Sequence, residues 1–169
     1  MTSPAVVEVP IQPSRAFVDG LVSAGLLVPT GSAGVWGRGP VFEHVVEAFE
    51  RLITRETHDD AATVMRFPPV IGRAHFERSE FLKSFPHLAG AVHCFDGTPD
   101  RHAELLSRIE DGREWSDLLS MADAVLVPAA CYPVYPASRG RLPKGGRLMD
   151  VSSYCFRHEP SPDPTRMVA

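Results

Sequence analysis

The chain has 169 residues, a length typical of one domain. Its 17 Lys and Arg residues stand against 21 Asp and Glu residues, so it lacks the basic excess of a general nucleic-acid binder. Apolar residues make up 44%, which excludes disorder of the whole chain, and no apolar run reaches the ~18–20 residues of a membrane span. No secretory signal is visible in residues 1–14, and only three cysteines are present, so we expect a cytoplasmic protein without a disulfide framework.

The first half of the chain alternates helical patterns with segments rich in Gly and Pro. In chain order we expect a helix over 15–27 capped by Ser14, a loop or irregular strand over 29–40, a helix over 41–54, a short strand over 63–67 and a helix over 77–86. The helix over 41–54 is the clearest, because its apolar residues form one stripe opposite a charged face: Val41, Phe42, Val45, Val46, Phe49, Leu52 and Ile53.

The second half is predicted to be a mixture of short elements. They are a strand over 91–95, helical segments over 101–109 and 114–121 broken at Gly112, a buried strand over 124–128, a basic loop over 139–148 and a strand over 149–157. The order shows no regular βαβ spacing, which favours an α+β fold with an antiparallel sheet.

Charge is distributed unevenly along the chain. Residues 132–169 contain six basic and three acidic residues, whereas the whole chain has a net charge of −4. This local excess of positive charge either arose by chance or forms a site for an anionic ligand such as a polyphosphate.

The segment that gives the most specific indication of function is MDVSSYCFRHE, residues 149–159. Alternation along a strand places Arg157 and Glu159 on one face, side by side at the strand's end. Taken alone, the pair could be a simple cross-strand ion pair. The string FRHE, however, resembles motif 2 of class II aminoacyl-tRNA synthetases. That resemblance implies that Arg157 holds the α-phosphate of ATP and the reacting carboxylate, that Glu159 accepts from the adenine amino group, and that Arg166 approaches the β- and γ-phosphates.

Two upstream segments fit the same fold in the expected order. Residues 41–69 resemble motif 1, which builds the homodimer interface. The segment AVLVPAACYPVYP resembles the seryl-tRNA synthetase stretch whose loop lies under the amino acid, here residues 128–132. Ala130 and Cys131 would then contact the substrate, and cysteine replaces the usual glutamate. On residue type alone, Cys131 could equally be a small buried apolar residue.

The whole visible chain resembles the amino acid:[carrier protein] ligases of rhizobia and related bacteria. GVWGRGPVFE, RFPPVIGRAHFERSEFLKSFPHL, VPAACYPVYP and CFRHEPSPDPTRM fit this family in order. The resemblance implies a class II synthetase-like antiparallel sheet flanked by helices, with no tRNA partner. It also implies ATP with Mg²⁺, a Zn²⁺ ion held partly by Cys131, and activation of glycine or another small amino acid. The product is transferred to the phosphopantetheine thiol of a small carrier protein.

By this resemblance, the 169 residues contain only part of the family's catalytic core. We expect residues 1–169 to be the N-terminal portion of a single catalytic domain, with motif 2 starting near 149 and the chain stopping inside its hairpin. The remaining zinc ligands, motif 3 and the carrier-docking surface would lie beyond Ala169, and the 169 residues alone are expected to be inactive. Two alternatives stay open: a seryl-type tRNA synthetase, and a non-catalytic paralogue that binds ATP or an amino acid.

Overall fold

The computed structural model describes residues 15–32 and 34–159, which form two compact units. The first unit contains the described residues up to Ile53, and the second contains those from Thr54 onward. The predicted cap Ser14 and the predicted ATP-loop residue Arg166 lie outside the described residues.

The first unit consists of two helices and a strand pair. Its elements are α1 (Arg15–Ser23), β1 (Leu27–Pro29), β2 (Trp36–Arg38) and α2 (Pro40–Glu56), whose last turn enters the second unit. The strands pair antiparallel, with Leu27 opposite Arg38. The predicted helix over 15–27 is confirmed but ends at Ser23, because Gly25 adopts a φ of +68° and turns the chain.

Helix α2 confirms the predicted helix over 41–54, although its apolar stripe is not buried. Val41, Val45 and Phe49 are 64%, 61% and 60% exposed. These residues are spaced four apart, so they lie on the same side of the helix. The predicted apolar stripe is therefore exposed at these three residues.

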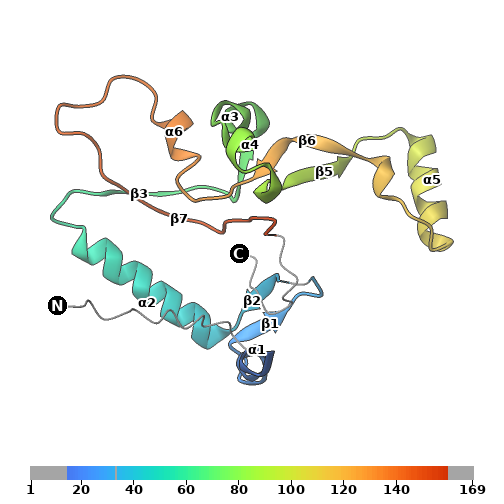
Figure 1. Cartoon of the computed structure of the whole chain (residues 1–169), viewed down its shortest axis with the longest axis horizontal. Helices are drawn as coiled ribbons and strands as arrows, with labels where there is room; N and C mark the ends of the chain where they lie inside the picture. The colour runs from blue at the N-terminus through green and yellow to red at the C-terminus, as the bar shows by residue number, and fades with distance from the viewer. Residues whose placement is uncertain (1–14, 33, 160–169) are drawn as a thin grey trace, which may run out of the picture. The chain divides into compact units, whose positions relative to one another are not determined.

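The second unit contains the larger set of elements. They are β3 (Thr63–Arg66), β4 (Val70–Gly72), α3 (Arg73–Arg78), α4 (Phe81–Ser84), η1 (Pro86–Leu88), β5 (Ala91–Phe95), α5 (Pro99–Glu110), η2 (Ser116–Leu118), β6 (Leu119–Leu126), α6 (Val134–Ala137) and β7 (Met149–Ser152). Strands β4, β6 and β5 form an antiparallel sheet with β6 at its centre, and β3 pairs with β7 in parallel. Figure 1 shows α3 and α4 beside β4 and β6, and α5 at the far end of β5 and β6. The α+β class is confirmed.

The core of the second unit lies where α3 and α4 meet the three-stranded sheet. Phe76 is 1% exposed, and its ring centroid lies 5.2 Å from that of Phe81. The buried apolar cluster draws on β4, α3, α4 and the end of β6: Ile71, Phe76, Phe81, Val125 and Val127. This packing fixes the point at which the chain leaves β6.

One predicted helix is wrong. Residues 114–121 were expected to be helical, but they form the short turn η2 and the first half of β6. Leu119 lies opposite Phe95 and Met121 opposite His93, so pairing with β5 determines the conformation. Pairing with β5 overrides the helical pattern here, because a local sequence pattern expresses only a weak conformational preference.

The predicted helix over 77–86 is divided into short pieces. Helix α3 ends at Arg78, and α4 begins at Phe81 after Glu80, whose φ is +61°. A left-handed residue cannot continue a right-handed helix, so the pattern is interrupted at this point. The strands predicted over 63–67 and 91–95 and the helix over 101–109 are confirmed as β3, β5 and α5.

Candidate functional site

The predicted substrate loop, residues 128–132, follows β6 directly and is held at both ends. The Val127 N–H donates to the carbonyl oxygen of Pro69 at 3.1 Å, and both Val127 and Pro128 are fully buried. At the far end, the Tyr132 N–H donates to the carbonyl oxygen of Ala129 at 3.2 Å, which closes a turn. The Tyr132 ring packs edge-on against Phe81 at 5.7 Å. The loop is therefore fixed to the core.

The motif-2-like segment lies beside this loop. Strand β7 ends at Ser152, and residues 153–159 continue without regular strand pairing. The Phe156 N–H nevertheless donates to the carbonyl oxygen of Val127 at 2.9 Å, and the His158 N–H donates to that of Leu88 at 3.2 Å. The predicted strand over 149–157 is thus confirmed only to Ser152. Its partner β3 ends just before Pro68 and Pro69, which have no N–H to extend the ladder.

Arg157 connects the two segments through its side chain. Its Nε donates to the carbonyl oxygen of Pro128 at 2.9 Å. A guanidinium has five N–H donors, so this bond leaves both Nη nitrogens available to a ligand. The structure therefore brings together Arg157 and the loop that contains Ala130 and Cys131. The ligands assigned to these residues stay predictions.

Two cysteines lie close to this junction, in different environments. Cys131 is exposed, whereas Cys155 is half-buried. Burial raises the pKa of the Cys155 thiol, and the neighbouring Arg157 and a hydrogen bond with the Ala130 backbone partly oppose that rise. The Cys155 thiol therefore stays protonated at neutral pH, so it is a poor nucleophile and a poor metal ligand.

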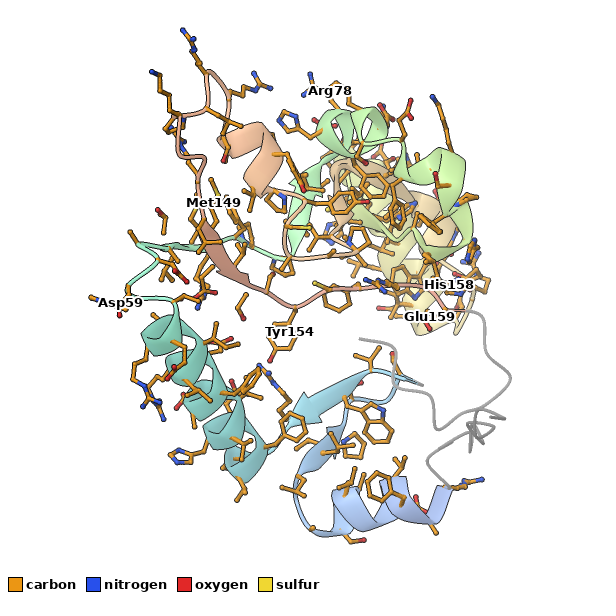
Figure 2. The ribbon with its side chains drawn as sticks, turned by 60° about the vertical axis from the view of Figure 1, so that its left-hand side comes forward. Asp59, Arg78, Met149, Tyr154, His158 and Glu159 are labelled. Atoms are coloured by element: carbon orange, nitrogen blue, oxygen red, sulfur yellow. The ribbon has the colours of Figure 1, made fainter. Side chains whose placement is uncertain are left out.

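Glu159 does not continue the alternation that the sequence predicted. Its N–H donates to the carbonyl oxygen of Arg157 at 2.9 Å, a tight three-residue turn centred on His158. The side chain of His158 is anchored as well, since its Nδ1 lies 3.3 Å from the carbonyl oxygen of His87. Figure 2 shows His158 and Glu159 together at the end of the described segment.

A cavity of about 570 Å³ opens next to Cys131. It is formed by β4, α3 with the residue directly after it, the end of the 128–132 loop, and α6 with Arg139, which lies two residues beyond that helix. Its lining residues are Ile71, His75, Arg78, Ser79, Cys131, Tyr132, Tyr135, Pro136 and Arg139. Burial raises the pKa of the Tyr132 hydroxyl, so this group stays neutral.

Arg78 and Arg139 belong to the cavity but were not predicted as site residues. Arg139 belongs to the predicted basic loop, and the charge excess of residues 132–169 was the only signal for it. His75 and Arg78 lie three residues apart on α3, and their side chains are hydrogen-bonded. Nothing in the sequence linked α3 to the 128–132 loop, because the two meet only through tertiary packing.

No group of three His, Cys, Asp or Glu side chains suited to a metal ion occurs within residues 15–32 and 34–159. Cys131 can supply one thiolate to a metal ion, and the described residues do not complete a ligand set around it. None of the helices in these same ranges is long and apolar enough to cross a membrane.

Comparison with solved structures identifies the fold. The M. kandleri seryl-tRNA synthetase, solved in complex with A. aeolicus tRNASec, matches with a TM-score of 0.68 over 85% of this chain and 30% of that chain. The sequence identity is 19%, so this likeness concerns the fold alone. The chain has the fold of part of a class II synthetase core, as the sequence predicted.

Sequence comparison gives a closer group. "Amino acid--[acyl-carrier-protein] ligase 1" of Bradyrhizobium diazoefficiens is 52% identical over 134 residues, which cover 78% of this chain and 40% of that protein. "Amino acid--[acyl-carrier-protein] ligase 2" of the same organism is 45% identical over 161 residues, which cover 93% and 48%. No family model matches. The chain spans less than half the length of these relatives, and over that span the predicted resemblance to the amino acid:[carrier protein] ligases is confirmed.

Proposed function

We propose that the protein carrying this chain activates a small amino acid, glycine above all, as an aminoacyl-adenylate and transfers it to the phosphopantetheine thiol of a carrier protein. The names of relatives that are 45% and 52% identical support a ligase that acts with a carrier protein. The observation that carries the proposal is the hydrogen bond from Arg157 to Pro128. It joins the arginine proposed to bind ATP to the loop proposed to bind the amino acid.

In the first step, a carboxylate oxygen of the amino acid attacks the α-phosphorus of ATP. A new O–P bond forms, the bond between the α-phosphorus and the oxygen bridging to the β-phosphate breaks, and pyrophosphate leaves. Negative charge grows on the non-bridging oxygens, where the Nη nitrogens of Arg157 donate hydrogen bonds. Glu159 accepts from the adenine amino group. Arg166, outside the described residues, is proposed to approach the β- and γ-phosphates of the ATP–Mg²⁺ complex.

In the second step, the phosphopantetheine sulfur attacks the carbonyl carbon of the adenylate. A C–S bond forms, the C–O bond to AMP breaks, and AMP leaves with that electron pair. The thiol proton passes to the released phosphate or to water. The 128–132 loop, fixed between Pro69 and Phe81, keeps the amino acid in place through both steps.

We also propose Cys131 as a zinc ligand. Its exposed position beside the cavity gives a metal ion access to its sulfur, and the further ligands would come from outside the described residues. Zinc, when bound, would act as a Lewis acid that holds the free amino group of the substrate. Ala130 belongs to the same loop, and its small side chain leaves room for the amino group of the substrate.

A homodimer is proposed as the assembled form. The face of α2 that contains Val41, Val45 and Phe49 is exposed, and a continuous apolar stripe favours a protein contact. A second copy of the same chain, as in the predicted motif 1 interface, is the partner that we propose for it.

The second candidate is a seryl-type tRNA synthetase, which the fold match favours. The chain is 19% identical to that synthetase and 52% identical over 134 residues to one of the ligases, so we rank the synthetase second. A non-catalytic paralogue is the third.

Amino-acid-dependent exchange of pyrophosphate into ATP tests the activation step. Transfer of labelled glycine to holo-carrier protein, with apo-carrier protein and total tRNA in parallel, then separates the candidates. Labelling of the holo-carrier protein alone is expected. Labelling of tRNA would favour the synthetase, and no exchange with any small amino acid would favour the non-catalytic paralogue.

A further inference from the structure

The side chain of His158 makes a contact that the proposed chemistry does not use. Its Nδ1 atom lies 3.3 Å from the carbonyl oxygen of His87. A carbonyl oxygen can only accept a hydrogen bond, so Nδ1 carries the proton and donates it. The backbone N–H of His158 donates to the carbonyl oxygen of Leu88 at 3.2 Å. Two adjacent carbonyl groups of η1 therefore hold this histidine at two points.

The short turn η1 is itself fixed to the core of the second unit. The Leu88 N–H donates to the carbonyl oxygen of Phe85 at 3.1 Å, which closes the turn at its start. Beyond its end, the carbonyl oxygen of Gly90 accepts from the Leu126 N–H on β6 at 3.0 Å. The side chain of Leu88 also packs against the buried apolar cluster. His158 is thus bonded to a part of the chain that is held on both sides.

Arg157 lies between two anchored residues. On one side, the Phe156 N–H donates to the carbonyl oxygen of Val127 at 2.9 Å, and on the other side His158 is bonded to η1. The Arg157 side chain then reaches the carbonyl oxygen of Pro128 through Nε at 2.9 Å. Strand β7 ends before this stretch, so these few bonds define the path of its backbone. The direction of the guanidinium therefore depends on them.

We propose that His158 is a positioning residue, which holds Arg157 in the orientation that amino-acid activation needs. This role rests on the proposed function, in which Arg157 binds the α-phosphate of ATP. The His158 side chain contacts the backbone of η1 and acts on the reaction only through its neighbour. Stabilisation of the growing charge depends on donors that are already in place. Loss of the anchor would let the guanidinium shift, and a shift of about 1 Å can lower a rate by on the order of 100-fold.

Pyrophosphate exchange by the full-length protein that carries this chain tests the role. His158→Leu removes the Nδ1 donor and keeps a side chain of similar size, and we expect kcat to fall about tenfold. The KM for the amino acid should stay within about twofold, because the 128–132 loop is held by its own bonds. His158→Asn should restore most of the rate, since its amide nitrogen can take the place of Nδ1. His158→Gln should not, since its amide nitrogen lies one bond further out.

A double-mutant cycle shows whether His158 acts through Arg157. We expect His158→Leu to slow exchange about tenfold in the unmodified protein and by less than about twofold in an Arg157→Lys background. A residue that only stabilises the fold would cost the same factor in both backgrounds. The matched control is His58→Leu, at a histidine whose side chain is 86% exposed. It should retain normal exchange, and the circular dichroism spectra of all variants should match that of the unmodified protein.

Three results would overturn the positioning role. They are an unchanged kcat in His158→Leu, equal losses in the leucine and asparagine variants, and equal losses in the two Arg157 backgrounds. Each of them is obtained with unmodified protein that exchanges pyrophosphate, so the proposed function would still stand. Absence of exchange with every small amino acid in the unmodified protein would instead overturn the proposed function, and the role of His158 with it.

Discussion

The Nε atom of Arg157 donates a 2.9 Å hydrogen bond to the carbonyl oxygen of Pro128. Pro128 is fully buried at the end of β6, so this bond holds the guanidinium by one edge against a rigid part of the core. The edge that carries the Nη atoms stays available to a ligand. A flexible surface arginine would lose more side-chain entropy on binding the same ligand.

In the protein that carries this chain, Arg157→Lys is expected to lower the rate of amino-acid-dependent pyrophosphate exchange by about 100- to 1,000-fold. Lysine keeps the charge, but its single ammonium cannot bond Pro128 and at the same time present two parallel donors to a phosphate. Steady-state exchange kinetics measure the effect. The control is Arg147→Lys in the exposed basic loop, which should retain normal exchange. Full exchange by the Arg157 variant would contradict the proposed role.

Cys131→Ala is expected to lose bound zinc and to raise the KM for the amino acid. Metal content by atomic emission and KM in the exchange assay are the measurements. Cys155→Ala is the matched control, since its half-buried thiol stays protonated and should contribute nothing to metal binding. One equivalent of zinc retained by the Cys131 variant would remove Cys131 from the ligand set.

The alkylation rate of Cys155 should depend on pH in a way that reflects its environment. Burial raises its pKa, and only the thiolate reacts with iodoacetamide. The midpoint of its rate profile is therefore expected above the ~8.5 of an ordinary thiol, so labelling stays slow at neutral pH and accelerates as pH rises. Peptide mass spectrometry follows the modification, with the exposed Cys94 as the accessible reference. Rapid labelling of Cys155 at pH 7 would contradict this environment.

Phe76→Ala is expected to destabilise the second unit by about 3–5 kcal/mol, because it removes a 1% exposed ring from the centre of the core. Urea unfolding followed by circular dichroism gives the free energy of unfolding. Leu82→Ala on the neighbouring helix is the control, since Leu82 is 43% exposed and should cost far less. Similar losses for the two variants would mean that the core does not depend on Phe76.

Val45→Glu combined with Phe49→Glu is expected to convert the proposed homodimer to a monomer. The two side chains are about 60% exposed and share one face of α2, so charges there would be buried in a dimer interface. Sedimentation equilibrium measures the mass. Glu47→Gln, on the charged side of the helix, should leave association unchanged. A monomeric unmodified protein would contradict the proposed assembly.

Local sequence patterns predicted a helix or strand correctly where its conformation is determined by its own residues. Helix α5 is one example, since Thr98 caps it and its Oγ1 accepts from the Arg101 N–H at 3.4 Å. Strand β5 is another, and its predicted bounds of 91–95 match the structure. The segment 114–121 could not be predicted in this way, because its conformation is set by pairing with β5.

The candidate site shows the same division. Arg157 and Cys131 were predicted from motifs, and the structure places their segments together, while their roles stay predictions. His75 and Arg78 were missed, because α3 reaches the cavity only through the packing of Phe76 and Phe81 under Tyr132. The end of the strand at Ser152 was missed too, since it depends on the prolines that follow the partner strand β3.

The parallel ladder between β3 and β7 has a consequence for folding. Thr63 pairs with Met149, so the ladder closes a long loop that contains the whole three-stranded sheet. The loop-closure entropy delays such contacts until the enclosed chain is compact. We expect the sheet and its core to form first and the segment with Arg157 to add to it last. Amide protons of Phe156 and His158 would then exchange with solvent sooner than those of β6.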